Sequence, residues 1–288
     1  MRKFISNPEE LNARQPTWCP GCGNHSIWLS LKQSITSLGL NPEEVVVSYG
    51  VGCSGNETNT LKTYGFHSLH GRPIPPAEGV KLTNHKLKVI AVSGDGDAYS
   101  EGMSHFIYSM RGNHDITYIV HDNQIYGLTT GQTSPTSAKG TVTKTTPDGS
   151  IEEPVNPIAL ALTVGATFVA RGFSGDNKQL TGLITAAIKH KGFSLVDVFQ
   201  PCVTFNKVNT FPWFFQRVYK LEDTDHKTDD YNAAWEKSHE MGDKIPTGIF
   251  YQVTKPAYHE QVRVLKEKPL IEQPVKVRDL SEDLKKYQ

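Results

Sequence analysis

Four cysteines are the residues of this sequence best suited to hold a metal centre. Cys19 and Cys22 form a Cys-Pro-Gly-Cys turn ahead of a predicted helix, and Cys53 and Cys202 each follow a predicted strand closely. The carboxyl ends of parallel strands share one edge of a sheet, and helices begin there, so all four sulfur atoms can converge at that edge. Four thiolates suit either a structural zinc ion or an iron–sulfur cluster.

The spacing of the cysteines favours the cluster. A zinc site would more typically show two paired motifs close together, and here only Cys19 and Cys22 form a pair. Convergence at one edge with no cysteine left over also favours a shared cluster. For Cys202 taken alone, a small buried apolar side chain is an equally good interpretation.

A second group of residues could bind magnesium and a diphosphate. Gly94-Asp95-Gly96-Asp97 directly follows an apolar run, and its glycines would let a phosphate approach the backbone closely. Asn123 lies just beyond the next apolar run, with Gly127 shortly after it. Asp95 could give a carboxylate oxygen, Asn123 an amide oxygen and Ile125 a backbone carbonyl, and magnesium prefers such oxygen ligands. Taken singly, Asp95 and Asn123 would more often cap helices and turns. On neighbouring strand ends they together indicate a metal site.

These residues need a sheet whose strands end at the same edge. Apolar, β-branched runs predict strands, and helical spacing predicts helices between them. The expected strands are residues 45–49, 87–92, 116–120, 167–170 and 194–199, and the expected helices are residues 27–38, 101–110, 158–164 and 180–190. This alternation predicts an α/β fold, with a mostly parallel sheet and helices on both faces.

Other segments lack a regular pattern. Residues 56–76 are rich in Gly, His and Pro and are expected to form loop and short helix. Residues 129–155 are polar throughout, and a loop of that length usually covers a site.

From residue 205 onward, aromatic and charged residues alternate without a clear period. We therefore expect a site-bearing domain over residues 1–204 and a C-terminal arm over residues 205–288. The arm contains Phe211, Trp213, Phe214 and Phe215. Aromatic residues at this density predict a partner interface, or alternatively a cover for the chain's own core.

Composition limits the classes of function. The 288 residues, 37% of them hydrophobic, suffice for one large α/β domain or one domain and an arm. The 30 basic and 30 acidic residues give zero net charge, so neither nucleic acid nor a membrane is expected as a partner. Residues 1–8 contain no apolar signal core and no apolar run is long enough to span a bilayer, which predicts a cytoplasmic protein. In that reducing compartment disulfides are not expected.

Several motifs together resemble a known family. Gly94-Asp95-Gly96, followed after 26 residues by Asn123, resembles the magnesium–diphosphate motif of thiamine-diphosphate enzymes, although Asp122 stands where that motif often has a first Asn. Over residues 12–255 the chain resembles the β subunit of 2-oxoacid:ferredoxin oxidoreductases. The motifs are Trp18-Cys19-Pro20-Gly21-Cys22-Gly23, Gly52-Cys53-Ser54-Gly55, Tyr64-Gly65-Phe66-His67, His70-Gly71-Arg72, Ile125-Tyr126-Gly127-Leu128-Thr129 and Gly131-Gln132-Thr133-Ser134-Pro135-Thr136.

The resemblance implies a set of cofactors and their ligands. Residues 1–204 would bind thiamine diphosphate and a [4Fe–4S] cluster, with Cys19, Cys22, Cys53 and Cys202 as the cluster ligands. Magnesium would be held by Asp95, Asn123 and the carbonyl of Ile125. The residues lining thiamine diphosphate would be Gly94, Gly96, Asp97, Gly127, Leu128 and Thr129. His67 and His70 would lie near the site and are candidates for a catalytic role, although a lone histidine is more often structural.

The resemblance also implies a reaction and partners. The thiazolium of the cofactor would attack the 2-oxo carbon of a 2-oxoacid, carbon dioxide would leave, and coenzyme A would take the acyl group. Single electrons would pass to the cluster and on to ferredoxin. The acid that activates the aminopyrimidine would come from another chain, the α (or fused γα) subunit.

The substrate and two other functions remain open at this stage. In the family, the position three after the third cysteine lies near the distal end of the substrate, and here it is the neutral Asn56. Together with the apolar Leu128, Asn56 argues for broad or pyruvate-like use, and 2-oxoglutarate stays an alternative because a partner could supply an arginine. A non-redox thiamine enzyme with structural zinc and a metal-stabilised α/β binding subunit are the other interpretations.

Overall fold

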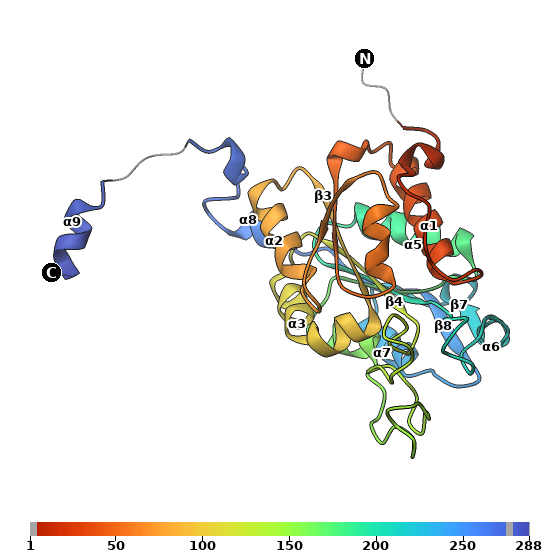
Figure 1. Ribbon diagram of the computed structural model, residues 1–288. Helices are drawn as coiled ribbons and strands as arrows, with labels where there is room; N and C mark the ends of the chain where they lie inside the picture. The colour runs from red at the N-terminus through yellow and green to blue at the C-terminus, as the bar shows by residue number, and fades with distance from the viewer. Residues whose placement is uncertain (1–4, 275–278, 288) are drawn as a thin grey trace.

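A single mixed sheet organises the molecule (Figure 1). The computed structural model describes residues 5–274 and 279–287, and within them eight strands pair in the order β2-β1-β3-β4-β6-β5-β8-β7. The strands are β1 Val45–Tyr49, β2 Tyr64–His67, β3 Lys88–Gly94, β4 Thr117–Asp122, β5 Phe168–Phe173, β6 Ser194–Phe199, β7 Val218–Lys220 and β8 Ile245–Gln252. β1 to β6 pair in parallel, β8 is antiparallel to β5, and β7 is parallel to β8.

Helices cover both faces of this sheet (Figure 1). They are α1 Asn24–Ser37, α2 Ile74–Thr83, α3 Met103–Gly112, α4 Pro157–Thr163, α5 Asn177–Lys189, α6 Phe211–Phe215, α7 Tyr231–Ser238, α8 Tyr258–Gln261 and α9 Ser281–Leu284. α1 and α5 enclose one apolar core, while α2, α3, α4 and α7 enclose a second. Within the described part of the chain, no helix combines the length and the apolar character needed to cross a bilayer.

The central strands are apolar on both sides because each side faces a core. In β3, Val89 and Ala91 belong to one core, whereas Ile90 and Val92 belong to the other. Successive side chains of a strand point to opposite faces, so a strand buried on both faces is a continuous apolar run. The predicted α/β fold with a mostly parallel sheet is confirmed.

The boundaries of the predicted elements agree well in the central sheet. β1 and β6 have the predicted bounds, and β3, β4 and β5 extend by a few residues toward the site. Two elements were missed in residues 56–76 and just beyond. β2 is exposed at the sheet edge along its whole length, so it lacks an apolar pattern. α2 begins with two prolines in its first turn, where a missing N–H costs little.

The segment expected as an arm contributes to the sheet. β7 and β8 both lie beyond residue 204, and β8 pairs directly with β5. Phe214 of α6 is 2% exposed and packs on Phe173 and Phe199, with ring centroids 5.3 and 4.7 Å away. Phe211 and Trp213 pack against the same cluster, whereas Phe215 is 59% exposed. Most of this aromatic group therefore covers the chain's own core, and contact of the segment with a partner stays a prediction. Residues 1–4, 275–278 and 288 of the two expected domains lie outside the described residues.

The packing of α6 predicts how much two of its phenylalanines contribute to the free energy of unfolding. Phe214→Ala should destabilise the fold by about 3–5 kcal/mol, because it leaves a cavity in a closed aromatic cluster. Phe215→Ala is the matched control on the same helix and should cost much less, since most of that ring is exposed. Thermal unfolding of the two variants, followed by circular dichroism, measures the difference. Equal losses would contradict this account of the packing.

Candidate functional site

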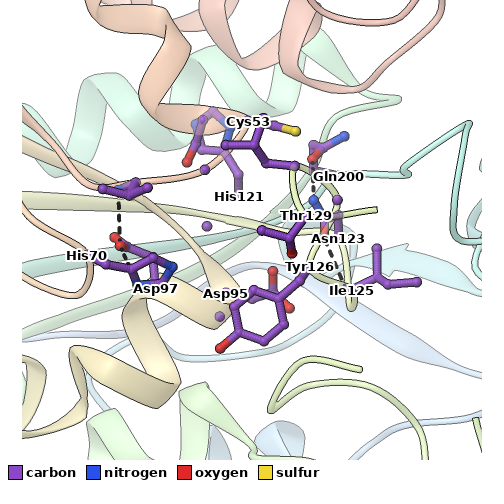
Figure 2. A pocket seen from close by; sticks show the side chains of 17 residues that line it. Cys53, His70, Asp95, Asp97, His121, Asn123, Ile125, Tyr126, Thr129 and Gln200 are labelled. Carbon is purple, nitrogen blue, oxygen red and sulfur yellow. Dashed lines mark hydrogen bonds and ion pairs between the residues drawn. The ribbon is translucent and has the colours of Figure 1, made fainter. Parts of the chain in front are cut away.

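The carboxyl ends of β1, β3, β4 and β6 meet at one edge and form the floor of a cavity. The register places Tyr49 of β1 beside Val92 of β3, Gly94 of β3 beside His121 of β4, and Asp122 of β4 beside Phe199 of β6. The strand-tip cavity above them is drawn in Figure 2. It is lined by residues 51–54, His70, residues 94–97, His121, Asn123, residues 125–129 and Gln200.

A second cavity, the cysteine cavity, is lined by all four cysteines. The Sγ atoms of Cys53 and Cys202 each lie 3.6 Å from the position that a Cβ on Gly127 would occupy. Thr204 Oγ1 donates to Cys19 Sγ at 3.1 Å, and Gln200 Nε2 donates to Cys22 Sγ at 3.2 Å. The structure thus brings together four cysteines from distant parts of the chain, and none of them forms a disulfide.

Crowding and burial disfavour the thiolate form in the absence of a bound cation. Burial raises the pKa of Cys22 and of Cys53 to about 11, and the neighbouring cysteines add to the effect in both cases. A metal centre reverses this preference, because coordination stabilises the thiolate. Among the described residues, no three Cys, His, Asp or Glu side chains are grouped so as to hold a single metal ion.

The two cavities are neighbours. Five residues line both of them: Cys53, Asn123, Gly127, Leu128 and Gln200. A group held in one cavity is therefore separated from a group held in the other by a single layer of side chains.

Asp95 presents its carboxylate at the tip of β3. The residue is buried, and its Oδ2 accepts hydrogen bonds from Ser134 Oγ and from Thr136 Oγ1, the latter at 2.7 Å. Burial raises the pKa of Asp95 to about 6 although these hydroxyl bonds act in the opposite direction. A Cβ on Gly96 would lie 2.2 Å from the ring of Tyr126, so any larger residue there would displace that ring.

Asn123 and Ile125 follow the tip of β4. Asn123 Oδ1 accepts from the Ile125 backbone N–H at 3.0 Å, and its Nδ2 donates to Gln200 Oε1 at 3.2 Å (Figure 2). The intervening Gln124 has a φ of 59°, which turns the chain sharply. Asp95, Asn123 and Ile125 therefore line one cavity, and their role as ligands of one metal ion stays a prediction.

Buried negative charge lies beneath Asp95. Asp122 contacts the Thr136 hydroxyl at 2.7 Å, and Asp197 forms an ion pair with Arg171 at 3.4 Å. Burial raises the pKa of Asp122 well above its usual range, and the charges of Asp197 and Asp95 raise it further. The carboxyl groups of Asp122 and Asp197 thus lie near a single guanidinium, that of Arg171, and a cation bound at Asp95 would favour the ionised form of Asp122.

Asp97 lies in the cavity wall but uses its carboxylate to hold the surrounding loops. Its Oδ1 accepts from the backbone N–H groups of Val51 and Gly71, at 3.0 and 2.7 Å. His70 also lines the cavity. Its Nδ1 lies 3.3 Å from the same oxygen of Asp97 and 3.2 Å from Glu101 Oε2.

The other candidate residues are placed differently. His67 is exposed on β2 and does not line the strand-tip cavity. Asn56 lines the cysteine cavity, and Leu128 lies on the wall between the two cavities with half of its side chain exposed. Gly94, Gly127 and Thr129 line the strand-tip cavity as expected.

The sequence interpretation missed several residues of the site. Ser134 and Thr136 belong to a motif noted above, so a signal for them existed, but their contact with Asp95 depends on how the long loop folds back. His121 and Gln200 stand at strand ends and carried no motif of their own. Tyr126 belongs to the motif at residues 125–129, but nothing in the sequence indicated a role for it.

Glu57 is a buried acid that lacks a partner. It is 0% exposed, and neither carboxyl oxygen has a hydrogen-bond partner among the described residues. The nearest opposite group is His121 Nε2, at 4.0 Å. Burial raises the pKa of Glu57 to about 8 from an ordinary value of 4.5. The folded protein therefore keeps Glu57 neutral over a pH range in which the unfolded chain ionises it.

This carboxyl group makes the free energy of unfolding depend on pH. Between 4.5 and about 8 the folded state binds the proton of Glu57 more tightly than the unfolded state, so stability falls as pH rises through that window. Glu57→Gln removes the titration. The variant should be more stable than the wild type at pH values above the window, by roughly 5 kcal/mol, and the advantage should shrink as pH falls toward the ordinary pKa of 4.5. Chemical denaturation of both proteins at several pH values measures this difference in stability. A difference that does not change with pH would refute the assignment of the titration to Glu57.

Comparison with known proteins agrees with the geometry. Residues 43–198 match the family described as thiamine pyrophosphate enzyme, C-terminal TPP binding domain. Residues 202–267 match the family that describes the C-terminal part of the pyruvate ferredoxin oxidoreductase beta subunit. The first match covers β1 to β5 and most of β6, with the tips of β1, β3 and β4, and the second covers α6 to α8.

Individual relatives extend over most of the chain. The 2-oxoacid:ferredoxin oxidoreductase subunit beta of a Sulfolobus species is 48% identical over 259 residues, which is 85% of this chain and 85% of the relative. Subunit beta of 2-oxoacid:ferredoxin oxidoreductase 1 from Aeropyrum pernix is 40% identical, and the match covers 92% of this chain and 87% of that relative.

A solved structure shows the same fold. The 2-oxoglutarate:ferredoxin oxidoreductase from Magnetococcus marinus, with 2-oxoglutarate, coenzyme A and succinyl-CoA bound, superposes with a TM-score of 0.85 at 38% identity. The match covers 88% of this chain and 87% of that one. The thiamine-diphosphate-binding fold, its oxidoreductase C-terminal region and the relatives matched over most of their length agree, and the chain belongs to the family of 2-oxoacid:ferredoxin oxidoreductase β subunits.

Proposed function

We propose that this protein holds the thiamine diphosphate, the magnesium ion and the [4Fe–4S] cluster of an enzyme that oxidatively decarboxylates a 2-oxoacid to its coenzyme A thioester. One observation supports the proposal most strongly: the cavity lined by four cysteines and the cavity at the strand tips share five wall residues. Electron transfer between a cofactor and a cluster needs such proximity. The α (or fused γα) subunit would complete the cofactor site, and ferredoxin would take the electrons.

Magnesium and the diphosphate suit the strand-tip cavity. Asp95, Asn123 and the Ile125 carbonyl offer one carboxylate and two neutral oxygens, which leaves positions for diphosphate oxygens and water. The charge of the ion would favour the ionised forms of Asp95 and Asp122, whose pKa values are raised by burial. Gly94, Gly96, Asp97, Gly127, Leu128 and Thr129 would line the cofactor. When bound, thiamine diphosphate supplies a thiazolium that accepts electron density from the decarboxylating substrate.

A cluster suits the cysteine cavity better than a zinc ion does. Four thiolates around one zinc ion stand about 2.3 Å from the metal and so lie close to one another. The four thiols here surround a cavity, and no three potential ligands among the described residues are grouped tightly enough for one ion. A [4Fe–4S] cube occupies more space and spreads its cysteine ligands further apart. This favours the redox enzyme over a non-redox thiamine enzyme with structural zinc.

Replacing Cys202 tests the cluster. Cys202→Ser should lose most of the iron and sulfide, because the fourth thiolate is then absent from the cavity. Thr204→Ser is the control on the same loop, since it keeps a hydroxyl near Cys19 Sγ. Iron and acid-labile sulfide per chain, measured on the anaerobically purified complex, give the answer, and full iron and sulfide content in Cys202→Ser would rule out the assignment.

Replacing Asp95 tests the metal site. Asp95→Ala should lose bound magnesium and thiamine diphosphate, with affinity reduced roughly tenfold or more, while the fold is retained. Asp148→Ala removes an exposed carboxylate from the polar loop and serves as the control. Cofactor retained after desalting, together with the circular dichroism spectrum, distinguishes loss of the site from unfolding. Unchanged retention in Asp95→Ala would exclude this residue as a ligand.

The substrate is proposed to be a 2-oxoacid, with pyruvate and 2-oxoglutarate as the two candidates. Asn56 is neutral, so this chain offers no cation there for a second carboxylate. Asn56→Lys should shift the ranking of kcat/KM in the complete enzyme toward 2-oxoglutarate and away from pyruvate. Asn56→Gln is the control that lengthens the side chain without charge. If the ranking is the same in all three proteins, a partner residue sets the specificity.

A further inference from the structure

We propose that Gln200 is a positioning residue that joins the metal site to the cluster site: its amide fixes the metal ligand Asn123 and donates a hydrogen bond to the cluster ligand Cys22. This inference rests on the proposed function, because it concerns residues that would hold magnesium and the cluster. It adds a single side chain that contacts both sites and that no sequence motif marks.

Both the nitrogen and the oxygen of the Gln200 amide form hydrogen bonds. The residue directly follows β6, is 1% exposed and lines both cavities. Its Nε2 donates to Cys22 Sγ at 3.2 Å and to the Pro201 carbonyl at 3.0 Å. Its Oε1 accepts from Asn123 Nδ2 at 3.2 Å. An amide nitrogen has two hydrogens, so both donations can be made at once.

These contacts determine which way both amides face. The Pro201 carbonyl can only accept a hydrogen bond, so the nitrogen of Gln200 must point to it. The oxygen of Gln200 then faces Asn123, and only the nitrogen of Asn123 can donate to it. The Oδ1 atom of Asn123, which a magnesium ion requires, is thereby directed away from Gln200 and toward the Ile125 side of the cavity. Gln200 and the Ile125 N–H group thus together orient the ligand atom.

Gly23 leaves the space that Gln200 occupies. A Cβ on Gly23 would lie 2.6 Å from Oγ of Ser174, and 3.0 and 3.2 Å from Cγ and Nε2 of Gln200, all tighter than ordinary contacts. Gly23 N–H also donates to the Pro201 carbonyl, at 3.4 Å. The close approach of the Ser174 and Gln200 side chains together therefore explains the glycine after the second cysteine.

The hydrogen bond to sulfur has an expected electronic effect. An N–H group that points at a cysteine ligand stabilises negative charge on it, and the reduced cluster carries one more negative charge than the oxidised one. Such bonds therefore raise the reduction potential. Thr204 Oγ1 makes a comparable bond to Cys19 Sγ at 3.1 Å, but its hydroxyl is not bonded to Asn123. Thr204 therefore offers a matched comparison that isolates the sulfur contact.

The test compares Gln200→Met and Thr204→Val in the assembled complex. Both should retain iron and sulfide, and both should show a lower midpoint potential than the wild type in a redox titration followed by electron paramagnetic resonance. Only Gln200→Met should also bind Mg²⁺ more weakly, roughly tenfold or more, in a titration of metal-stripped complex with thiamine diphosphate present. Wild-type potential and Mg²⁺ affinity in Gln200→Met would overturn the inference, as would an equal loss of Mg²⁺ affinity in Thr204→Val.

Gln200→Glu gives a second route if the methionine variant does not assemble. Its carboxylate still accepts from Asn123 Nδ2 but cannot donate to sulfur, so Mg²⁺ affinity should stay near the wild-type value while the potential falls. A wild-type potential in this variant would also overturn the inference. The proposed function is judged separately: a wild-type complex without a cluster would refute it, whereas a normal cluster with unaffected Gln200 variants would refute this inference alone.

Discussion

The shared edge of the parallel strands is the constraint on which the rest of this structure depends. β1, β3, β4 and β6 end together, so chain segments far apart in the sequence deliver their next few residues to one place. This edge receives a carboxylate from the turn after β3, an amide from the turn after β4, and cysteines from the segments after β1 and β6. The proposed site for two cofactors needs no further domain on this side, because the sheet already fixes how far apart these residues lie.

The same edge concentrates buried carboxyl groups whose pKa values are raised by burial. Asp95 and Asp122 share a hydroxyl from the long loop, and Glu57 has no hydrogen-bond partner among the described residues. Burying such groups costs free energy unless a partner compensates it. For Asp95 and Asp122 a bound cation is the natural compensation. The hydroxyls of Ser134 and Thr136 occupy Oδ2 of Asp95, and this anchors the base of the loop over residues 129–155 directly to the proposed metal site.

Much of this arrangement could be predicted from residues whose patterns are local. The apolar runs at β1 and β6 are buried on both faces and have the predicted bounds. Cys19 and Cys22, expected ahead of a helix, and Cys53 and Cys202, expected after strands, line one cavity. β2 and β8 were missed for physical reasons: β2 is an exposed edge strand, and β8 joins the sheet only through antiparallel pairing with β5. Gln200 could not be found from the sequence, because its role depends on two partners that only the fold brings within reach.

We propose above all that one chain holds a redox cluster beside a thiamine-diphosphate site. The most direct measurement is electron paramagnetic resonance of the anaerobically purified complex after a 2-oxoacid is added with neither coenzyme A nor ferredoxin present. The account predicts a brown protein in which the substrate alone produces the signal of a reduced [4Fe–4S] cluster, and in which Asp95→Ala abolishes that signal without loss of iron. A colourless protein that contains zinc and gives no such signal would contradict it.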